Sequence, residues 1–166
     1  STYWLPPTKI DKLNSNVMVY VVNARRRYNI PEEDAAARRR AVHEWASLTD
    51  GKVISFMNYG GAANTPHIFA EDIKDLDGLI IGEDMWVAHH RGGLAQHGFN
   101  HLNYYVSASL WWDIDQDIDK LLDEYYSDFY GPAADEMKAF VNYYERHQDQ
   151  MSQINSADII KTALDL

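Results

Sequence analysis

Three short apolar runs, separated by longer amphipathic stretches, organise the first half of the chain. The runs cover residues 16–22, 52–59 and 78–82, and each has the length of a β-strand. The first run is continuous rather than alternating, which is typical of a strand buried on both faces of a parallel sheet. The third run ends at Glu83-Asp84. We therefore predict three parallel strands, adjacent in the sheet and in chain order.

The stretches between these runs have the spacing of helices. One helix is predicted to begin at Pro31-Glu32-Glu33-Asp34 and to end at Asp50-Gly51, with Val42 and Trp45 on its apolar face. A second, short helix is expected over residues 68–74. Strands that alternate with helices imply parallel βαβ units with right-handed crossovers.

The second half of the chain reads as helical. We predict helices over about residues 99–112, 117–129 and 133–154, with Gly131-Pro132 ending the middle one. The last helix has an apolar face at a period of about 3.6 residues. Its members are Met137, Phe140, Val141, Tyr144 and Met151. We expect Trp111 and Trp112, which lie in the first of these helices, to be core residues.

Three parallel strands alone leave sheet edges unpaired and a face uncovered. A complete (β/α)8 barrel of the TIM type has eight strands and about 250 residues, against 166 here. The favoured interpretation is α/β, with residues 1–113 forming the C-terminal part of such a barrel, about strands six to eight. Residues 114–166 would be a helical tail packed on it, and another chain or segment would complete the barrel. The alternative is a small three-stranded α/β domain that stands alone.

Charge and composition narrow the classes of partner. The net charge of −10 disfavours nucleic acid, whose phosphates an acidic protein repels. No apolar run approaches the roughly 20 residues that span a bilayer, so no membrane span is expected, and no signal peptide is visible. The chain contains no cysteine, which excludes disulfides, thiolate metal sites and a cysteine nucleophile.

Four aromatic-rich stretches carry a resemblance to a known family. They are Leu102–Val106, Leu110-Trp111-Trp112-Asp113, Asp117–Tyr126 and Phe129-Tyr130-Gly131-Pro132-Ala133-Ala134. Together they resemble the C-terminal region of the uncharacterised-domain family 4838, part of which is classified as glycoside hydrolase family 163. The resemblance covers most of residues 3–147. Ile114 stands where the family usually has Pro.

The resemblance implies an activity. Characterised members of that glycoside hydrolase family are endo-β-N-acetylglucosaminidases that act on N-glycans. The chain is thus expected to be part of a hydrolase that cleaves a β-linked glycan containing N-acetylglucosamine, incomplete as a single chain. A secreted, periplasmic or cell-surface location follows from the same resemblance, and no cofactor is expected.

Carboxylates at the ends of barrel strands are the natural catalytic candidates, because barrel enzymes place catalytic groups there. Glycoside hydrolysis normally needs two carboxyl groups. Glu83, at the end of the third apolar run, is the leading candidate for a general acid or nucleophile, and Asp84 is the alternative. An ion pair or a loop cap is the structural reading of Glu83. The second carboxylate is expected outside this chain.

Five side chains after the second and third predicted strands are candidates for binding the glycan. Sugars stack on aromatic rings and offer hydroxyl groups to polar side chains. The candidates are Asn58, Tyr59, Trp86, His89 and His90. Packing beneath the loops is the alternative for Trp86.

Two patterns suggest metals, and neither is complete. His97 and His101 have the i, i+4 spacing of a zinc helix, but Gly98 occupies the position of the expected Glu. Acidic residues occupy positions 1, 3, 5, 7 and 12 of a calcium loop from Asp113 to Glu124, but Ile118 stands where the turn needs Gly. The same acids read well as the start of a helix at Asp117, so no metal site is predicted.

Two functions from different classes therefore remain. One is the hydrolase. The other is a non-catalytic carbohydrate-binding or scaffolding module that kept the fold and lost the chemistry. A pair of carboxyl groups about 5–10 Å apart across a cleft would favour the enzyme.

Overall fold

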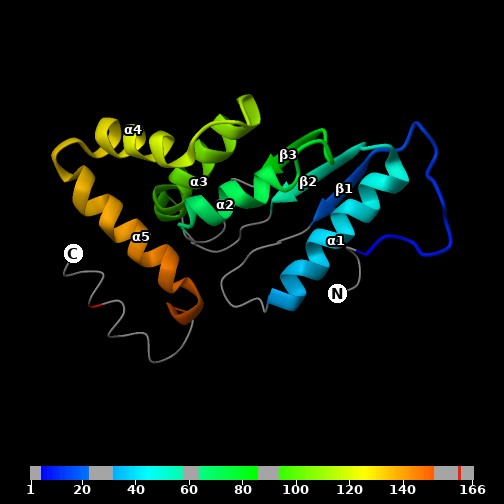
Figure 1. Ribbon diagram of the computed structural model, residues 1–166, viewed down its shortest axis with the longest axis horizontal. Helices are drawn as coiled ribbons and strands as arrows, with labels where there is room; N and C mark the ends of the chain where they lie inside the picture. The colour runs from blue at the N-terminus through cyan, green and yellow to red at the C-terminus, as the bar shows by residue number, and fades with distance from the viewer. Residues whose placement is uncertain (1–4, 23–31, 58–63, 86–93, 152–160, 162–166) are drawn as a thin grey trace.

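The computed structural model describes residues 5–22, 32–57, 64–85, 94–151 and 161. Its elements are a small parallel sheet and a set of helices (Figure 1). The helices are α1 (Glu32–Thr49), α2 (Pro66–Lys74), α3 (Leu94–Trp112), α4 (Ile118–Tyr130) and α5 (Ala134–Met151), with a 3-10 turn, η1 (Gly131–Ala133), between the last two. None of the described helices is long and apolar enough to cross a bilayer.

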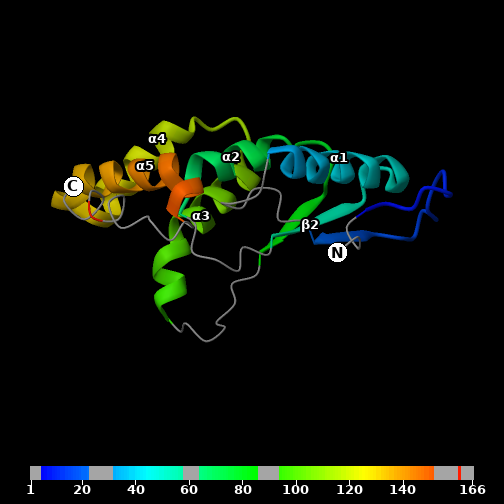
Figure 2. The ribbon, with the colours of Figure 1, turned by 90° about the horizontal axis from the view of Figure 1, so that it is seen from below.

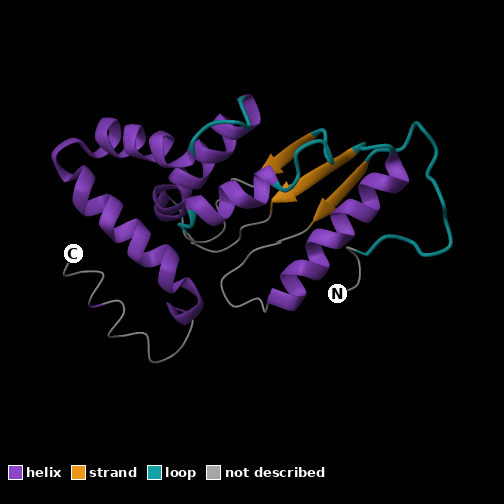
Figure 3. Ribbon diagram, in the orientation of Figure 1, coloured by secondary structure: helices purple, strands orange, loops and turns teal. Residues whose placement is uncertain are grey.

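The sheet has three strands, β1 (Val19–Val22), β2 (Val53–Met57) and β3 (Gly82–Met85), in the order β1-β2-β3. Both pairings are parallel. The prediction of three adjacent parallel strands in chain order is therefore confirmed, and Figure 3 shows the strands side by side.

The predicted bounds of the third strand were wrong. Residues 78–81 of the apolar run form a turn and the approach to the sheet, in which Gly78 has φ +71° and the Leu79 N–H donates to the Leu76 carbonyl. Ile80 follows the turn and is buried in the cluster that also contains Val42 and Ala46 of α1. Hydrophobic burial thus explains Ile80 without a strand, whereas Ile81 is exposed. Glu83 lies inside β3 and not after its end.

Two hydrophobic clusters hold these elements together. The first lies between the sheet and α1 and contains Val21, Val42, Ala46, Val53, Leu76 and Ile80. The second joins α2, α3, α4 and α5 and contains Phe69, Ala70, Ile73, Leu102, Val106, Leu110, Leu122, Tyr126 and Val141. The Trp111 side chain packs against both. The expected apolar face of α5 is confirmed at Met137, Phe140 and Val141, which lie in or against the second cluster.

The prediction that both tryptophans are core residues was wrong for Trp112, whose side chain is 91% exposed. Successive residues of a helix differ by about 100° in direction, so the two neighbours face different sides of α3. Trp111 faces the two clusters, and Trp112 faces solvent.

The two faces of the sheet differ. Side chains alternate between faces along a strand, and Val21, Val53 and Ser55 are buried on the face that α1 covers. Tyr20 and Val22, on the other face, are 56% and 54% exposed. Figure 2 shows α1 and α2 on the same side of the sheet. We call the face that carries Tyr20 and Val22 the open face.

Asp117 begins α4 as its N-cap. Its side chain accepts hydrogen bonds from the backbone N–H groups of Asp119 and Lys120 at 3.0 and 3.2 Å. Removing such a cap lowers stability by about 1 kcal/mol. We expect Asp117→Ala to lower the free energy of unfolding by this amount in urea denaturation. Glu124→Ala, an exposed mid-helix change, is the control. Equal effects of the two would contradict the capping role.

Candidate functional site

Glu83, the leading catalytic candidate, is held by α3. Its Oε2 atom accepts hydrogen bonds from the Ser107 hydroxyl at 2.8 Å and from the Trp111 indole N–H at 2.9 Å. Ser107 is buried, and Trp111 packs against both hydrophobic clusters. The Glu83 carboxylate therefore lies on the helix-covered face of the sheet, where it fastens β3 to α3.

Asp84 lies on the opposite face. It pairs in register with Phe56, which pairs in turn with Val22, so the three side chains belong to the open face. Asp84 is exposed and is the penultimate residue of its strand. Adjacent in sequence, the two candidate carboxylates are thus separated by the sheet. Of the two, Asp84 is the one that a substrate on the open face could reach.

The five predicted sugar-binding residues cannot be placed around Asp84. Asn58, Tyr59, Trp86, His89 and His90 lie outside the described residues. They follow β2 and β3 directly in the chain, and their role stays a prediction.

His101, one of the two histidines with the i, i+4 spacing of a zinc helix, lies among aromatic residues. Its Nδ1 atom bonds the Tyr125 hydroxyl and its Nε2 lies 3.3 Å from the Tyr130 hydroxyl. Burial lowers the pKa of His101 below its usual 6.5. A neutral ring with one N–H and one acceptor nitrogen suits two hydroxyl partners. The described residues contain no group of three His, Asp or Glu side chains that could hold a metal.

The acidic stretch from Asp113 to Glu124 uses two of its carboxylates locally. Asp113 accepts the backbone N–H of Asp115 at 3.1 Å, and Asp117 caps α4. The interpretation of these acids as the start of a helix is confirmed.

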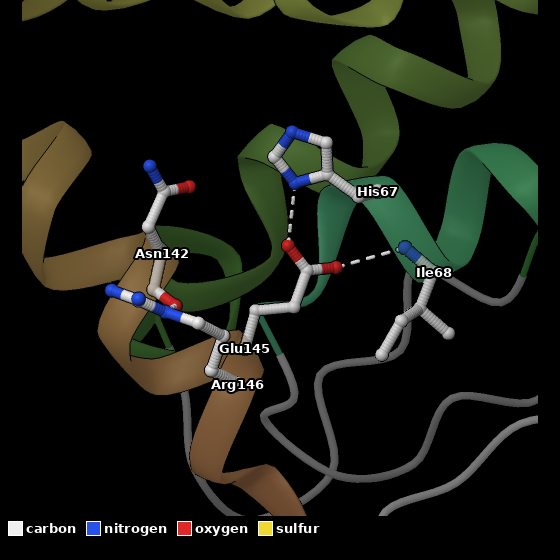
Figure 4. Close-up of a pocket in the computed structure, with 5 residues that line it drawn as sticks. All are labelled: His67, Ile68, Asn142, Glu145 and Arg146. Carbon is white, nitrogen blue, oxygen red and sulfur yellow. Dashed lines mark hydrogen bonds and ion pairs between the residues drawn. The ribbon is translucent and has the colours of Figure 1, made fainter.

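A pocket that sequence reasoning did not anticipate lies between α2 and α5. It has a volume of about 560 Å³ and is lined by His67, Ile68, Asn142, Glu145 and Arg146. Figure 4 shows the Glu145 carboxylate pointing from α5 toward the first turn of α2. One carboxylate oxygen lies 2.6 Å from His67 Nδ1, and the other accepts the Ile68 N–H at 2.8 Å. Glu145 is only 8% exposed.

The same histidine also contacts α4. His67 Nε2 lies 3.3 Å from an Asp119 carboxylate oxygen. A neutral imidazole has one N–H, so only the protonated ring can donate to both carboxylates. The hydrogen bond to Glu145 raises the pKa of His67 above its usual 6.5, against the opposing effect of burial. In its protonated form the His67 ring would donate to both carboxylates and so join α2, α4 and α5.

Comparison with known proteins gives one match. The family model for the domain of unknown function DUF4838 matches residues 2–142, most of the chain. The chain belongs to the DUF4838 family. No curated protein and no solved structure shows significant similarity to it.

The DUF4838 match spans all three strands and the helices through the first half of α5. Asp84, Glu83, Ser107 and Trp111 therefore lie within the family region. Glu145 lies just beyond it and 78 residues from His67. A contact between residues so distant, carried by no motif, leaves no signal in a single sequence.

Proposed function

We propose that this DUF4838 chain is the C-terminal part of a (β/α) barrel glycoside hydrolase that acts on a β-linked glycan containing N-acetylglucosamine. The resemblance to glycoside hydrolase family 163 suggests the substrate. The observation that carries the proposal is the sheet: three consecutive parallel strands, helices on one face, and an acidic residue at a strand end on the other.

This arrangement suits a barrel wall. In a barrel the helices cover the outside, and the side chains of the opposite face point into the interior and the mouth. The open face would then be the interior. Its exposed Tyr20 and Val22 would be covered when further strands close the barrel.

Within the proposal, Asp84 is the catalytic carboxylate that this chain supplies. Its position near the carboxyl end of β3 is where barrel enzymes hold their catalytic groups. The partner carboxylate would come from a strand outside this chain. A separation of about 5–5.5 Å between the two would indicate retention of configuration, and about 6.5–9.5 Å inversion.

The proposal also assigns Glu83 a positioning role. With its carboxylate bonded to Ser107 and Trp111, Glu83 fixes β3 against α3 and so fixes the direction of Asp84. In this way β3 carries the positioning residue, Glu83, on its helix-covered face and the catalytic residue, Asp84, on its open face.

The test is an assay of the full-length protein on a complex N-glycan. We expect cleavage between the two core N-acetylglucosamine residues, detected by mass spectrometry of the released glycan. Binding of the glycan in calorimetry without cleavage would support the non-catalytic carbohydrate-binding module instead. If the protein neither binds nor cleaves the glycan, the hydrolase and the carbohydrate-binding module are both overturned.

A further inference from the structure

We propose that His67 and Glu145 form a proton-operated latch, which holds the C-terminal half of α5 beside the start of α2, across the pocket between them. The two walls of the pocket belong to different helices: His67 and Ile68 come from α2, and Asn142, Glu145 and Arg146 come from α5 (Figure 4). The latch bonds one wall to the other. The inference is independent of the proposed hydrolase activity.

The latch acts where α5 has little other support from α2. α5 packs chiefly on α4 and η1, and its core residue Val141 precedes the latch by one turn. At Glu145 the carboxylate reaches across to α2, where it accepts the Ile68 N–H, one of the donors that a helix start leaves without an intrahelical partner. The position of the last turns of α5 therefore depends on this carboxylate and its partners.

Deprotonation of His67 weakens the latch in two ways. The neutral ring keeps one N–H, so it can donate to Glu145 or to Asp119 but not to both. The remaining hydrogen bond joins a neutral ring to a carboxylate, and it is weaker than one between two charged groups. Glu145 would then be a buried carboxylate without a cation bonded to it, which is unfavourable in a site with so little contact with water.

Other charged groups surround His67. From α5 come Glu145 and Arg146, whose Nε donates to the Asn142 carbonyl at 3.0 Å. From α4 comes Asp119, and Glu71 follows one turn later on α2 itself. The two carboxylates that contact the ring favour its charged form.

The direction of the pH effect follows from this. The folded protein raises the pKa of His67, so the latch is fully closed below pH 6.5, the usual pKa, and opens as the pH rises through the higher folded value. Each unit by which the pKa is raised corresponds to a factor of about ten in the equilibrium between closed and open states.

Hydrogen exchange of the full chain, followed by mass spectrometry from about pH 6 to about pH 9 and corrected for the intrinsic pH dependence, tests the latch. We expect the peptides that cover residues 142–147 to lose protection as the pH rises, while peptides from α1 do not change. In His67→Gln, protection of residues 142–147 should be low and independent of pH.

The control is His43→Gln. His43 lies on α1, exposed, with its Nε2 4.0 Å from Asp75, so the change removes a histidine near a carboxylate without touching the pocket. This variant should keep the pH dependence of the unmodified chain. Should His67→Gln fail to fold, NMR titration of His67 in the unmodified chain and in Glu145→Gln replaces it, and the pKa should fall in the latter. Protection of residues 142–147 that does not vary with pH in the unmodified chain would overturn the latch.

Discussion

Replacing Trp111 with alanine is expected to lower the free energy of unfolding by about 3 kcal/mol or more. The indole packs against the cluster between the sheet and α1 and against the cluster among α2 to α5. It also donates a hydrogen bond to Glu83 at 2.9 Å. The substitution would therefore leave a cavity where the two clusters meet and would remove a donor from a partly buried carboxylate.

The neighbouring tryptophan provides a matched control. Trp112→Ala removes the same side chain one residue later in the same helix, but its side chain is 91% exposed. Surface changes of this kind usually alter stability by no more than about 0.5 kcal/mol. Urea denaturation of both variants measures the difference. Similar losses for the two would show that Trp111 does not join the clusters as the structure describes.

The contrast between these tryptophans also shows what the sequence could predict. Both occur in a strongly helical segment, and composition alone treats them as equally apolar. The helix itself was predicted, though with its start at about Phe99 instead of Leu94. Which of two adjacent residues faces the core depends on how α3 is rotated against α2 and the sheet. Tertiary packing sets that rotation.

The third strand illustrates a different limit. The run Leu79-Ile80-Ile81 has the composition of a strand, but Ile80 is buried in the link between a turn and the sheet, and the strand begins at Gly82. Burial accounts for apolar residues in either structure, so a short apolar run does not distinguish them. The strand begins a few residues later than predicted, and this determines where Glu83 and Asp84 point. A side chain inside a strand has a fixed face of the sheet, and a side chain in a loop does not. The order and direction of the strands were predictable because strands and helices alternate along the chain. The contact between His67 and Glu145 was not predictable, because the two residues lie 78 residues apart and belong to no motif.

The second large effect concerns the two adjacent carboxylates, and it rests on the proposed hydrolase. In the full-length protein, Asp84→Asn is expected to lower turnover of the N-glycan by about 10²-fold or more with little change in stability, as for loss of a general acid or nucleophile. Asp84 is exposed on the open face, so the amide that replaces its carboxylate breaks no internal contact described for the carboxylate.

Glu83→Gln is the matched comparison, since it makes the same chemical change one residue away. Its carboxylate accepts from Ser107 and Trp111 on the helix-covered face, so the substitution should lower stability by about 1–3 kcal/mol. Turnover per folded molecule should stay within about tenfold of the unmodified protein, because the residue positions β3 and does not touch the sugar. Steady-state kinetics, with the folded fraction measured by circular dichroism, separates the two effects. A loss of turnover in Glu83→Gln together with full turnover in Asp84→Asn would reverse the assignment and return the catalytic role to Glu83, the residue that the sequence pattern favoured.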